Sequence, residues 1–271
     1  MYPVAFDYVR AESVAHALDC LAEPDVESKL LAGGHSLIPM LKLRLAVPEV
    51  LVDVSGLDEL RGVSAGPSDV RIGAATTWRE LLLDAGLREA TPLVPEAVRL
   101  IGDRQVRARG TIGGSVAHAD AAADIPAPLL ALDAEVEIAG PDGRRRMALD
   151  DFLVGMFQTD LDEAEVLTAL TFRVPPPGTT AAYEKFDQPA SHLALCGVAA
   201  AVTRDGDGRV QRARLAVTGV TGRAFRAREA EDLLVGERLD DSSVAAASQR
   251  AATGIEPRSD IHADAAYRAN L

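Results

Sequence analysis

Two glycine-rich segments carry the residues best suited to hold a ligand through the main chain. The first reads Ala32-Gly33-Gly34-His35-Ser36, and the second reads Thr111-Ile112-Gly113-Gly114-Ser115. Glycine has no Cβ, so the backbone there can approach a ligand closely and adopt positive φ angles. Successive free backbone N–H groups form a concave anion site, and a helix after the first segment would add its positive end. The two segments therefore predict a diphosphate site that needs no lysine.

Each Gly-Gly pair is also typical of a tight turn that binds nothing, and the residues alone leave this alternative open. The common nucleotide motifs Gly-x-Gly-x-x-Gly and Gly-x-x-x-x-Gly-Lys are absent from the sequence. Residues 34–38 imitate the nucleophile elbow of hydrolases but lack its closing glycine. We therefore predict that His35 positions or stacks on a ligand and is not a catalytic base, and we assign no catalytic side chain.

The charge and hydropathy of the chain exclude several classes of partner. Of the 271 residues, 48% are hydrophobic and 25% are charged, which is typical of a globular protein. The 41 acidic residues outnumber the 28 basic ones, and the net charge of -13 gives no general attraction to nucleic acid or an anionic membrane. No apolar run approaches the ~20 residues of a membrane span, and no signal peptide is recognisable. We expect a cytoplasmic protein.

Metal-centred redox chemistry is not expected in this chain. It has two cysteines, Cys20 and Cys196, whereas a four-thiolate zinc or iron–sulfur site needs four. Both cysteines are predicted to be buried thiols. His118 lies near Asp120, but no further ligand follows at a suitable spacing. Any metal centre must therefore belong to another chain.

The elements that position the first glycine segment are predicted to form a βαβ-type unit. A helix capped by Ser13 runs to Leu21, and an apolar strand at residues 29–32 leads into the glycines. A helix at residues 36–45 and a strand at residues 50–54 follow. The alternation of strands and helices favours parallel strands.

The second glycine segment lies in a longer region that lacks regular alternation. Thr77 and Glu80 predict a capping box at the start of a helix over residues 78–85. Residues 104–128, rich in glycine and alanine, are predicted to be irregular. The other predicted elements are a hairpin at 63–65 and 70–73, a helix at 92–100, and strands at 134–139, 145–148 and 166–174.

The run Pro175-Pro176-Pro177-Gly178 is the strongest predicted domain boundary. It separates an N-terminal domain, residues 1–176 with parts at about 1–56 and 57–176, from a C-terminal domain, residues 177–271. The C-terminal domain is predicted to contain strands at 181–186, 193–203 and 210–218, then helices at 225–234 and 241–253. This order predicts an α+β fold with a three-stranded C-terminal sheet and helices.

The glycine segments and their neighbours resemble the FAD-binding medium subunits of molybdenum hydroxylases, most closely the carbon monoxide dehydrogenase type. The resemblance includes residues 32–39, residues 111–115 with Asp120 and Asp124, and the stretch Tyr183-Glu184-Lys185-Phe186. It covers nearly the whole chain. It implies an FAD domain of the vanillyl-alcohol-oxidase (PCMH) type in two parts, and a C-terminal domain that covers the flavin.

In such proteins both glycine segments hold the pyrophosphate of one non-covalent FAD. The resemblance places Asp124 near the ribityl or isoalloxazine end, and it brings Lys185 to the flavin from the C-terminal domain. The alternatives are that Asp124 caps a helix before Ile125-Pro126 and that Lys185 is an exposed strand end.

The sequence departs from the pattern of these relatives at three places. Leu193, preceded by His192, replaces an aromatic residue beside the flavin, so stacking there is lost. Residues 120–124 replace a more usual Asp-Pro sequence. The printed sequence ends soon after Tyr267-Arg268, where relatives continue into a further helix, so we expect a shorter C-terminal domain or a last helix supplied otherwise.

The resemblance implies an electron-transfer subunit of a multi-subunit oxidoreductase, in a dimer of heterotrimers. A large molybdopterin subunit would oxidise the substrate, and a small subunit with two [2Fe–2S] clusters would pass electrons to this FAD and on to an external acceptor. The substrate and the acceptor (quinone, oxygen or NAD) stay open. The alternatives are a self-sufficient flavin oxidase or dehydrogenase and a nucleotide-binding scaffold without redox function; aromatic residues at 4% disfavour the oxidase.

Overall fold

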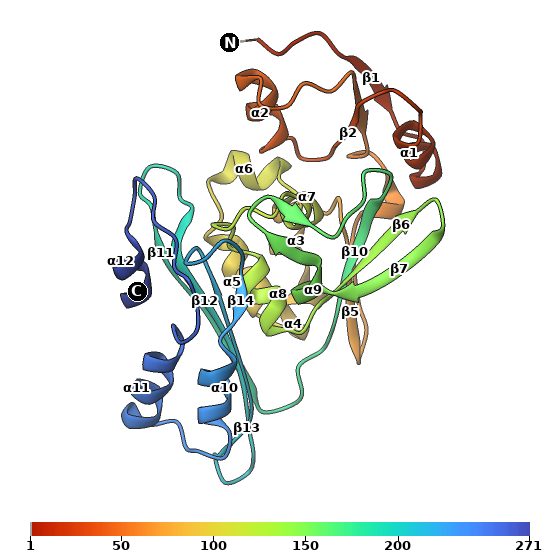
Figure 1. The fold of residues 1–271 in the computed structure, drawn as a ribbon. Helices are drawn as coiled ribbons and strands as arrows, with labels where there is room; N and C mark the ends of the chain where they lie inside the picture. The colour runs from red at the N-terminus through yellow and green to blue at the C-terminus, as the bar shows by residue number, and fades with distance from the viewer. Residues whose placement is uncertain (1) are drawn as a thin grey trace.

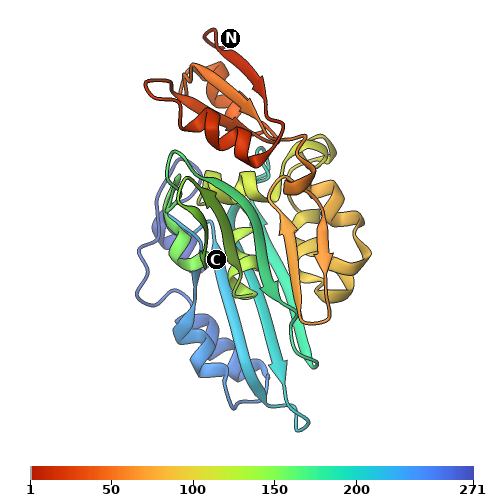
Figure 2. The same ribbon diagram turned by 90° about the vertical axis from the view of Figure 1, so that its right-hand side faces the viewer.

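The computed structural model describes residues 2–271, which form three larger sheets, one two-stranded sheet and short helices (Figure 1). A three-stranded sheet lies at one end of the molecule, and the five- and four-stranded sheets lie side by side in its body (Figure 2). The expected α+β class is confirmed. No helix among residues 2–271 combines the length and apolar character needed to cross a bilayer.

The N-terminal unit contains the predicted βαβ arrangement. Its elements are β1 (Asp7–Arg10), α1 (Val14–Leu21), β2 (Ser28–Leu31), α2 (Leu37–Leu43) and β3 (Val50–Asp53). The three strands are parallel in the order β1-β3-β2. Ser13 caps α1 as predicted, because its side chain accepts a hydrogen bond from the His16 backbone N–H. The first glycine segment therefore follows the carboxyl end of a parallel strand, a usual place for ligands in such units.

The second sheet is antiparallel, in the order β4-β5-β10-β6-β7. Its strands are β4 (Val63–Ala65), β5 (Asp69–Gly73), β6 (Glu135–Gly140), β7 (Gly143–Ala148) and β10 (Val166–Arg173). The helices and smaller elements beside it are η1 (Asp58–Leu60), α3 (Trp78–Leu83), α4 (Ala85–Ala90), α5 (Leu93–Arg99), α9 (Leu149–Phe152), β8 (Leu153–Gly155) and β9 (Gln158–Thr159). The predicted capping box of Thr77 and Glu80 is present. The helix ends before residue 85 because Asp84 caps α4.

The prediction that residues 104–128 are irregular is wrong. The region contains α6 (Arg104–Arg109), α7 (Ile112–His118) and α8 (Pro126–Ala131). Asp103 caps α6 by accepting from the Val106 N–H, and Thr111 caps α7 by accepting from the Gly114 N–H. Short length hides these helices from periodicity, whereas the caps of α6 and α7 are visible in the sequence.

The C-terminal sheet has four strands rather than the predicted three, in the order β11-β12-β13-β14. The strands are β11 (Thr179–Asp187), β12 (Ala194–Arg204), β13 (Val210–Thr218) and β14 (Phe225–Arg226), and the helices are α10 (Arg228–Leu234), α11 (Asp241–Arg250) and α12 (Ala265–Asn270). The expected helix at residue 225 begins at Arg228, because Phe225 pairs with Val217. The third helix, α12, was not predicted.

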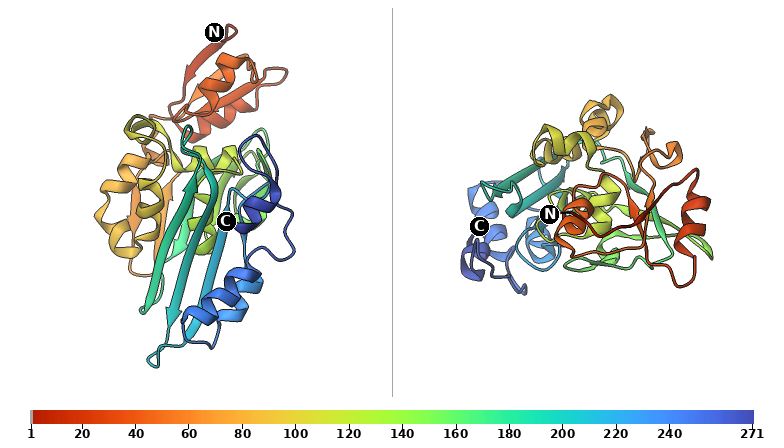
Figure 3. Two further views of the ribbon diagram at one scale, coloured as in Figure 1. Left: turned by 90° about the vertical axis from the view of Figure 1, so that its left-hand side faces the viewer. Right: turned by 90° about the horizontal axis from the view of Figure 1, so that it is seen from above.

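The C-terminal sheet separates two hydrophobic cores. Ala199 and Ala216 face the larger core, which also holds Trp78 and Leu129, and α8 packs there against β12 and β13. The alternate residues Val198 and Val217 face the core shared with α10 and α11. Figure 3 shows α10, α11 and α12, in blue, beside one face of the sheet. Burial on both faces fixes the sheet firmly against the rest of the chain.

Candidate functional site

A cavity of about 640 Å³ lies between the N-terminal unit and the body of the molecule. This volume lies within the usual range for small-molecule and cofactor sites. Of the residues predicted for the site, those that line the cavity are Ala32, Gly33, Gly34, His35, Ser36, Thr111, Gly114, Ser115 and Asp124. Ile112, Gly113 and Lys185 are absent from the lining that the described residues form. The fold thus brings both glycine segments and Asp124 to one cavity.

The first glycine segment presents free main-chain donors to this cavity. Within residues 2–271, the backbone N–H groups of Gly33, Gly34, His35 and Ser36 have no hydrogen-bond acceptor. Gly34 has a φ of +72°, which glycine adopts without strain. A Cβ at Gly33 would lie 2.4 Å from the Arg109 carbonyl oxygen, so this segment packs closely on the loop before the second one. The prediction of free donors is confirmed here.

His35 supports the conformation of the same segment. Its Nδ1 lies 3.0 Å from the carbonyl oxygen of Gly33, two residues earlier. The side chain is exposed at the cavity rim, and no carboxylate of the described chain holds it as an acid–base pair would require. The geometry agrees with a positioning residue.

The second glycine segment differs, because its N–H groups from Ile112 to Ser115 already have acceptors within the protein. The Ile112 N–H donates to the Thr76 carbonyl oxygen at 3.1 Å, and the Gly113 N–H donates to that of Ala74 at 2.9 Å. A Cβ at Gly113 would lie only 2.4 Å from the Ala74 Cβ. The expectation of a second set of free N–H groups is therefore wrong. Gly113 allows α7 to pack closely against the loop after β5.

Asp124 is a buried carboxylate whose two oxygens have different partners. Its exposed fraction is 4%. The Tyr183 hydroxyl donates to Oδ1 at 2.7 Å, and the Lys185 ammonium donates to Oδ2 at 2.9 Å. Burial raises the pKa of Asp124 above its ordinary value, whereas the charge of Lys185 opposes the rise. The helix-cap alternative is wrong, because α8 has Ile125 as its N-cap.

Lys185 ties three walls of the cavity together. Its side chain is 3% exposed, so the alternative of an exposed strand end is wrong. Besides Asp124, the ammonium donates to the carbonyl oxygens of Leu100 at 3.0 Å and His192 at 2.6 Å. An ammonium has three protons, and each of them has an acceptor here. Lys185 therefore braces the loop after α5, the loop before α8 and the loop between β11 and β12.

Two families of known domains match consecutive parts of the chain. The family described as "FAD binding domain in molybdopterin dehydrogenase" matches residues 4–177, and the "CO dehydrogenase flavoprotein C-terminal domain" matches residues 181–271. The chain belongs to the family of FAD-binding medium subunits of molybdenum hydroxylases. It is an oxidoreductase subunit whose cofactor is FAD, and its role is to carry electrons.

Known medium subunits resemble this chain over nearly its whole length. The carbon monoxide dehydrogenase medium chain of Hydrogenophaga pseudoflava is 38% identical over 99% of this chain and 93% of its own. The alpha subunit of the 6-hydroxypseudooxynicotine dehydrogenase complex of Paenarthrobacter nicotinovorans is 38% identical over 100% of this chain and 92% of its own. In solved structures, Hydrogenophaga pseudoflava carbon monoxide dehydrogenase matches with a TM-score of 0.95 at 40% identity, over 100% of this chain and 94% of its own. Quinoline 2-oxidoreductase from Pseudomonas putida matches with a TM-score of 0.94 at 35% identity, over the same shares of the two chains.

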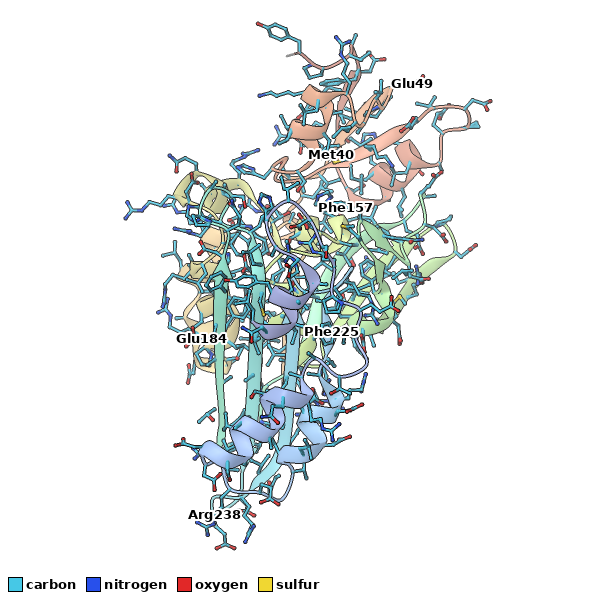
Figure 4. All side chains as sticks on the ribbon, turned by 60° about the vertical axis from the view of Figure 1, so that its left-hand side comes forward. Met40, Glu49, Phe157, Glu184, Phe225 and Arg238 are labelled. Atoms are coloured by element: carbon cyan, nitrogen blue, oxygen red, sulfur yellow. The ribbon has the colours of Figure 1, made fainter. Side chains whose placement is uncertain are left out.

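In this medium subunit, several cavity residues escape sequence reasoning. These are Met40 on α2, Trp78, Gly110 and His118, whereas Leu193, which also lines the cavity, is a position that the resemblance places beside the flavin. Figure 4 labels Met40 in the N-terminal unit and Phe157 in the part of the chain below it. Gly110 had a usable signal, since it precedes the cap of α7; a Cβ there would lie 2.6 Å from Trp78 Nε1.

His118 and Leu193 are two further residues of the cavity lining. The rings of His118 and Phe157 lie 4.9 Å apart, and burial lowers the pKa of His118. Leu193 is 41% exposed and follows His192, which has a φ of +56°. A leucine at this position offers apolar contact but no aromatic face. Among residues 2–271, no group of three His, Cys, Asp or Glu side chains is placed to hold a metal ion.

Proposed function

We propose that this cavity holds one FAD without a covalent link and that the first glycine segment binds its pyrophosphate. This proposal is supported above all by the backbone N–H groups of residues 33–36, which have no acceptor among residues 2–271. These residues line the same cavity as Asp124. Main-chain N–H groups bind phosphate oxygens through hydrogen bonds and the local backbone dipole. A chain of net charge -13 can therefore bind a diphosphate without a lysine there.

The remaining predicted residues are proposed to serve other parts of the same cofactor. Thr111, Gly114 and Ser115 border the cavity and supply a hydroxyl-bearing wall, whereas Ile112 and Gly113 support α7 from behind. Asp124 would face the ribityl or isoalloxazine end. An ionised carboxylate only accepts hydrogen bonds, and an ionised diphosphate has no donor to give it. Lys185 would hold Asp124 and the loop with His192 in place.

We propose that the chain works in a complex with a small [2Fe–2S] subunit and a large molybdopterin subunit, as a dimer of heterotrimers. Bound FAD supplies the redox chemistry that accepts electrons from the iron–sulfur clusters and delivers them to an external acceptor. Relatives named as a medium chain and as a subunit of a dehydrogenase complex support this assignment. The residues of this chain bind and orient the cofactor and exclude water from one side of it.

The proposed division of labour follows the predicted domains. Residues 1–176 would supply the pyrophosphate site, and residues 177–271 would supply the loop that covers the flavin end. Asp133 supports a firm contact between them, because it forms ion pairs with Arg212, Arg214 and Arg226. The cytoplasmic location stays a prediction, which cell fractionation can test.

The function is tested by anaerobic stopped-flow measurement at the flavin absorbance. The purified full chain should contain FAD that dithionite reduces, yet no hydroxylase substrate should bleach it. Addition of the iron–sulfur and molybdopterin subunits should make the bleaching substrate-dependent. Bleaching by substrate with this chain alone would favour the self-sufficient oxidase, and a chain without flavin would favour the scaffold.

A further inference from the structure

The Tyr183 hydroxyl makes a buried contact with the site, and the predicted set of binding residues gives it no role. Tyr183 lies on β11 with an exposed fraction of 5%. Its Oη donates to Asp124 Oδ1 at 2.7 Å, across 59 residues of sequence. Lys185, on the same face of β11, donates to the other oxygen at 2.9 Å. Two donors from one strand therefore fix the rotation of the Asp124 carboxylate.

A glycine on the neighbouring strand makes room for this hydroxyl. Gly197 on β12 is the register partner of Lys185. A Cβ at Gly197 would lie 2.2 Å from the Tyr183 Oη, well inside van der Waals contact. Any larger residue at position 197 would displace the hydroxyl from its place beside Asp124. The geometry of the Tyr183–Asp124 pair thus depends on two strands of the C-terminal sheet.

The orientation of Asp124 matters because this residue lines the cavity, whereas Tyr183 and Lys185 are absent from the lining that residues 2–271 form. An ionised carboxylate is a hydrogen-bond acceptor only. Ribityl hydroxyls and the isoalloxazine N–H can donate to it, but the pyrophosphate and its negative charge cannot. Within residues 2–271, the charged groups that face Asp124 are Lys185 and Asp187, both on β11, and the Tyr183 hydroxyl is the one neutral donor to its carboxylate.

We propose that Tyr183 is a positioning residue that holds the Asp124 carboxylate for the flavin end of the cofactor. This inference rests on the proposed function, in which the cavity binds FAD with its pyrophosphate at the first glycine segment. Removal of the hydroxyl leaves Asp124 with Lys185 as its single side-chain donor and free to turn away. Binding of the flavin end should weaken, and binding of the adenine–diphosphate end should not change.

The test compares FAD with ADP, which lacks the flavin end. Dissociation constants of both ligands are measured by calorimetry on the full-length apo chain and on the Tyr183→Phe variant. The variant should bind FAD roughly tenfold more weakly, the effect of one hydrogen bond to a charged group, and ADP equally well. Tyr8→Phe is the matched control, because Tyr8 also donates to an aspartate, Asp53, but on exposed β1.

A double-mutant cycle then tests whether Tyr183 acts through Asp124. In an Asp124→Asn background, Tyr183→Phe should change the FAD dissociation constant less than twofold. Equal weakening of FAD and ADP, or an unchanged FAD dissociation constant in Tyr183→Phe, would overturn this inference while the proposed function stands. A wild-type chain that binds neither ligand would overturn the proposed function and the inference with it.

Discussion

The two glycine segments share almost the same pattern of residue types, and the protein uses them differently. At Gly33 and Gly34 the main-chain N–H groups have no acceptor among residues 2–271. At Ile112 and Gly113 the N–H groups donate to the loop after β5, and a Cβ on Gly113 would collide with Ala74. We propose that the N–H groups of the first segment contact a ligand, whereas Gly113 in the second segment lets a helix approach its neighbours.

The comparison teaches that a Gly-Gly pair indicates a main chain closely approached by other atoms. The pair does not indicate whether those atoms belong to a ligand or to the protein. Part of the protein approaches both segments, at Gly33 and at Gly113. The segments differ in their N–H groups, which lack an acceptor among residues 2–271 only from Gly33 to Ser36 and can be reached by a ligand there. Substitutions should therefore separate the two roles: ligand affinity should change at one segment, and stability at the other.

The largest effect is expected for Gly113→Val. The new side chain would meet the Ala74 Cβ at 2.4 Å and the Ala74 carbonyl oxygen at 2.7 Å, in a region that cannot shift easily. Overpacking at such a site costs about 3 kcal/mol, equivalent to a fall in Tm of roughly 6–12 °C by circular dichroism. Gly222→Val is the control, because nothing lies within 4 Å of a Cβ there. Equal Tm values for the two variants would contradict the packing role.

A smaller effect, on affinity rather than stability, is expected for Gly34→Val. A β-branched residue at a φ of +72° is strained, so the segment should leave the conformation that aligns its N–H groups. Strain of about 1–3 kcal/mol corresponds to roughly fivefold to 150-fold weaker binding of FAD. Fluorescence titration of the apo chain measures it. A large loss of Tm with unchanged affinity would reverse the assignment of roles.

The two hydroxyl residues that precede α2 and α7 offer a finer test. Thr111 accepts a hydrogen bond from the Gly114 N–H, whereas Ser36 makes no cap bond with its side chain. Thr111→Ala should lower the free energy of unfolding in urea by about 1 kcal/mol. Ser36→Ala should change it by less than about 0.5 kcal/mol. Similar losses in both variants would show that Ser36 also serves the fold.

The smallest effect is expected for His35→Ala, which should not change whether the cofactor can be released from the protein. We expect acid precipitation to release the yellow chromophore into the supernatant from the wild-type chain and from His35→Ala alike. Hydrogen bonds from the first glycine segment need no covalent tether. A wild-type pellet that stays yellow, with release from His35→Ala alone, would show a covalent bond through this histidine.

Local signals predicted the elements that carry the first glycine segment. The Ser13 cap and the strand before Gly33 follow from short-range chemistry, as does the capping box of Thr77 and Glu80. The helices between residues 104 and 131 were missed because six or seven residues are too few to show a hydrophobic period. Their caps at Asp103 and Thr111 were the better guide.

The site depends on contacts that no local pattern contains. The carbonyl oxygens of Ala74 and Thr76, which accept from N–H groups of the second segment, belong to a loop far upstream in the sequence. The partners of Asp124 lie 59 and 61 residues downstream on β11. Family resemblance indicated that Asp124 and Lys185 belong to the site. Only the fold reveals that Lys185 and Tyr183, both absent from the lining that residues 2–271 form, donate hydrogen bonds to the carboxylate.

The three bonds of the Lys185 ammonium have a consequence for how the protein is made. The carbonyl of Leu100 lies 85 residues before Lys185 in the sequence, so a ribosome must synthesise most of the chain before this contact can form. The first glycine segment belongs to a unit with local connections and can fold early during synthesis. We therefore expect the pyrophosphate end of the pocket to exist before its flavin end is complete. Nascent chains halted before β11 should then bind ADP but gain little from the rest of FAD.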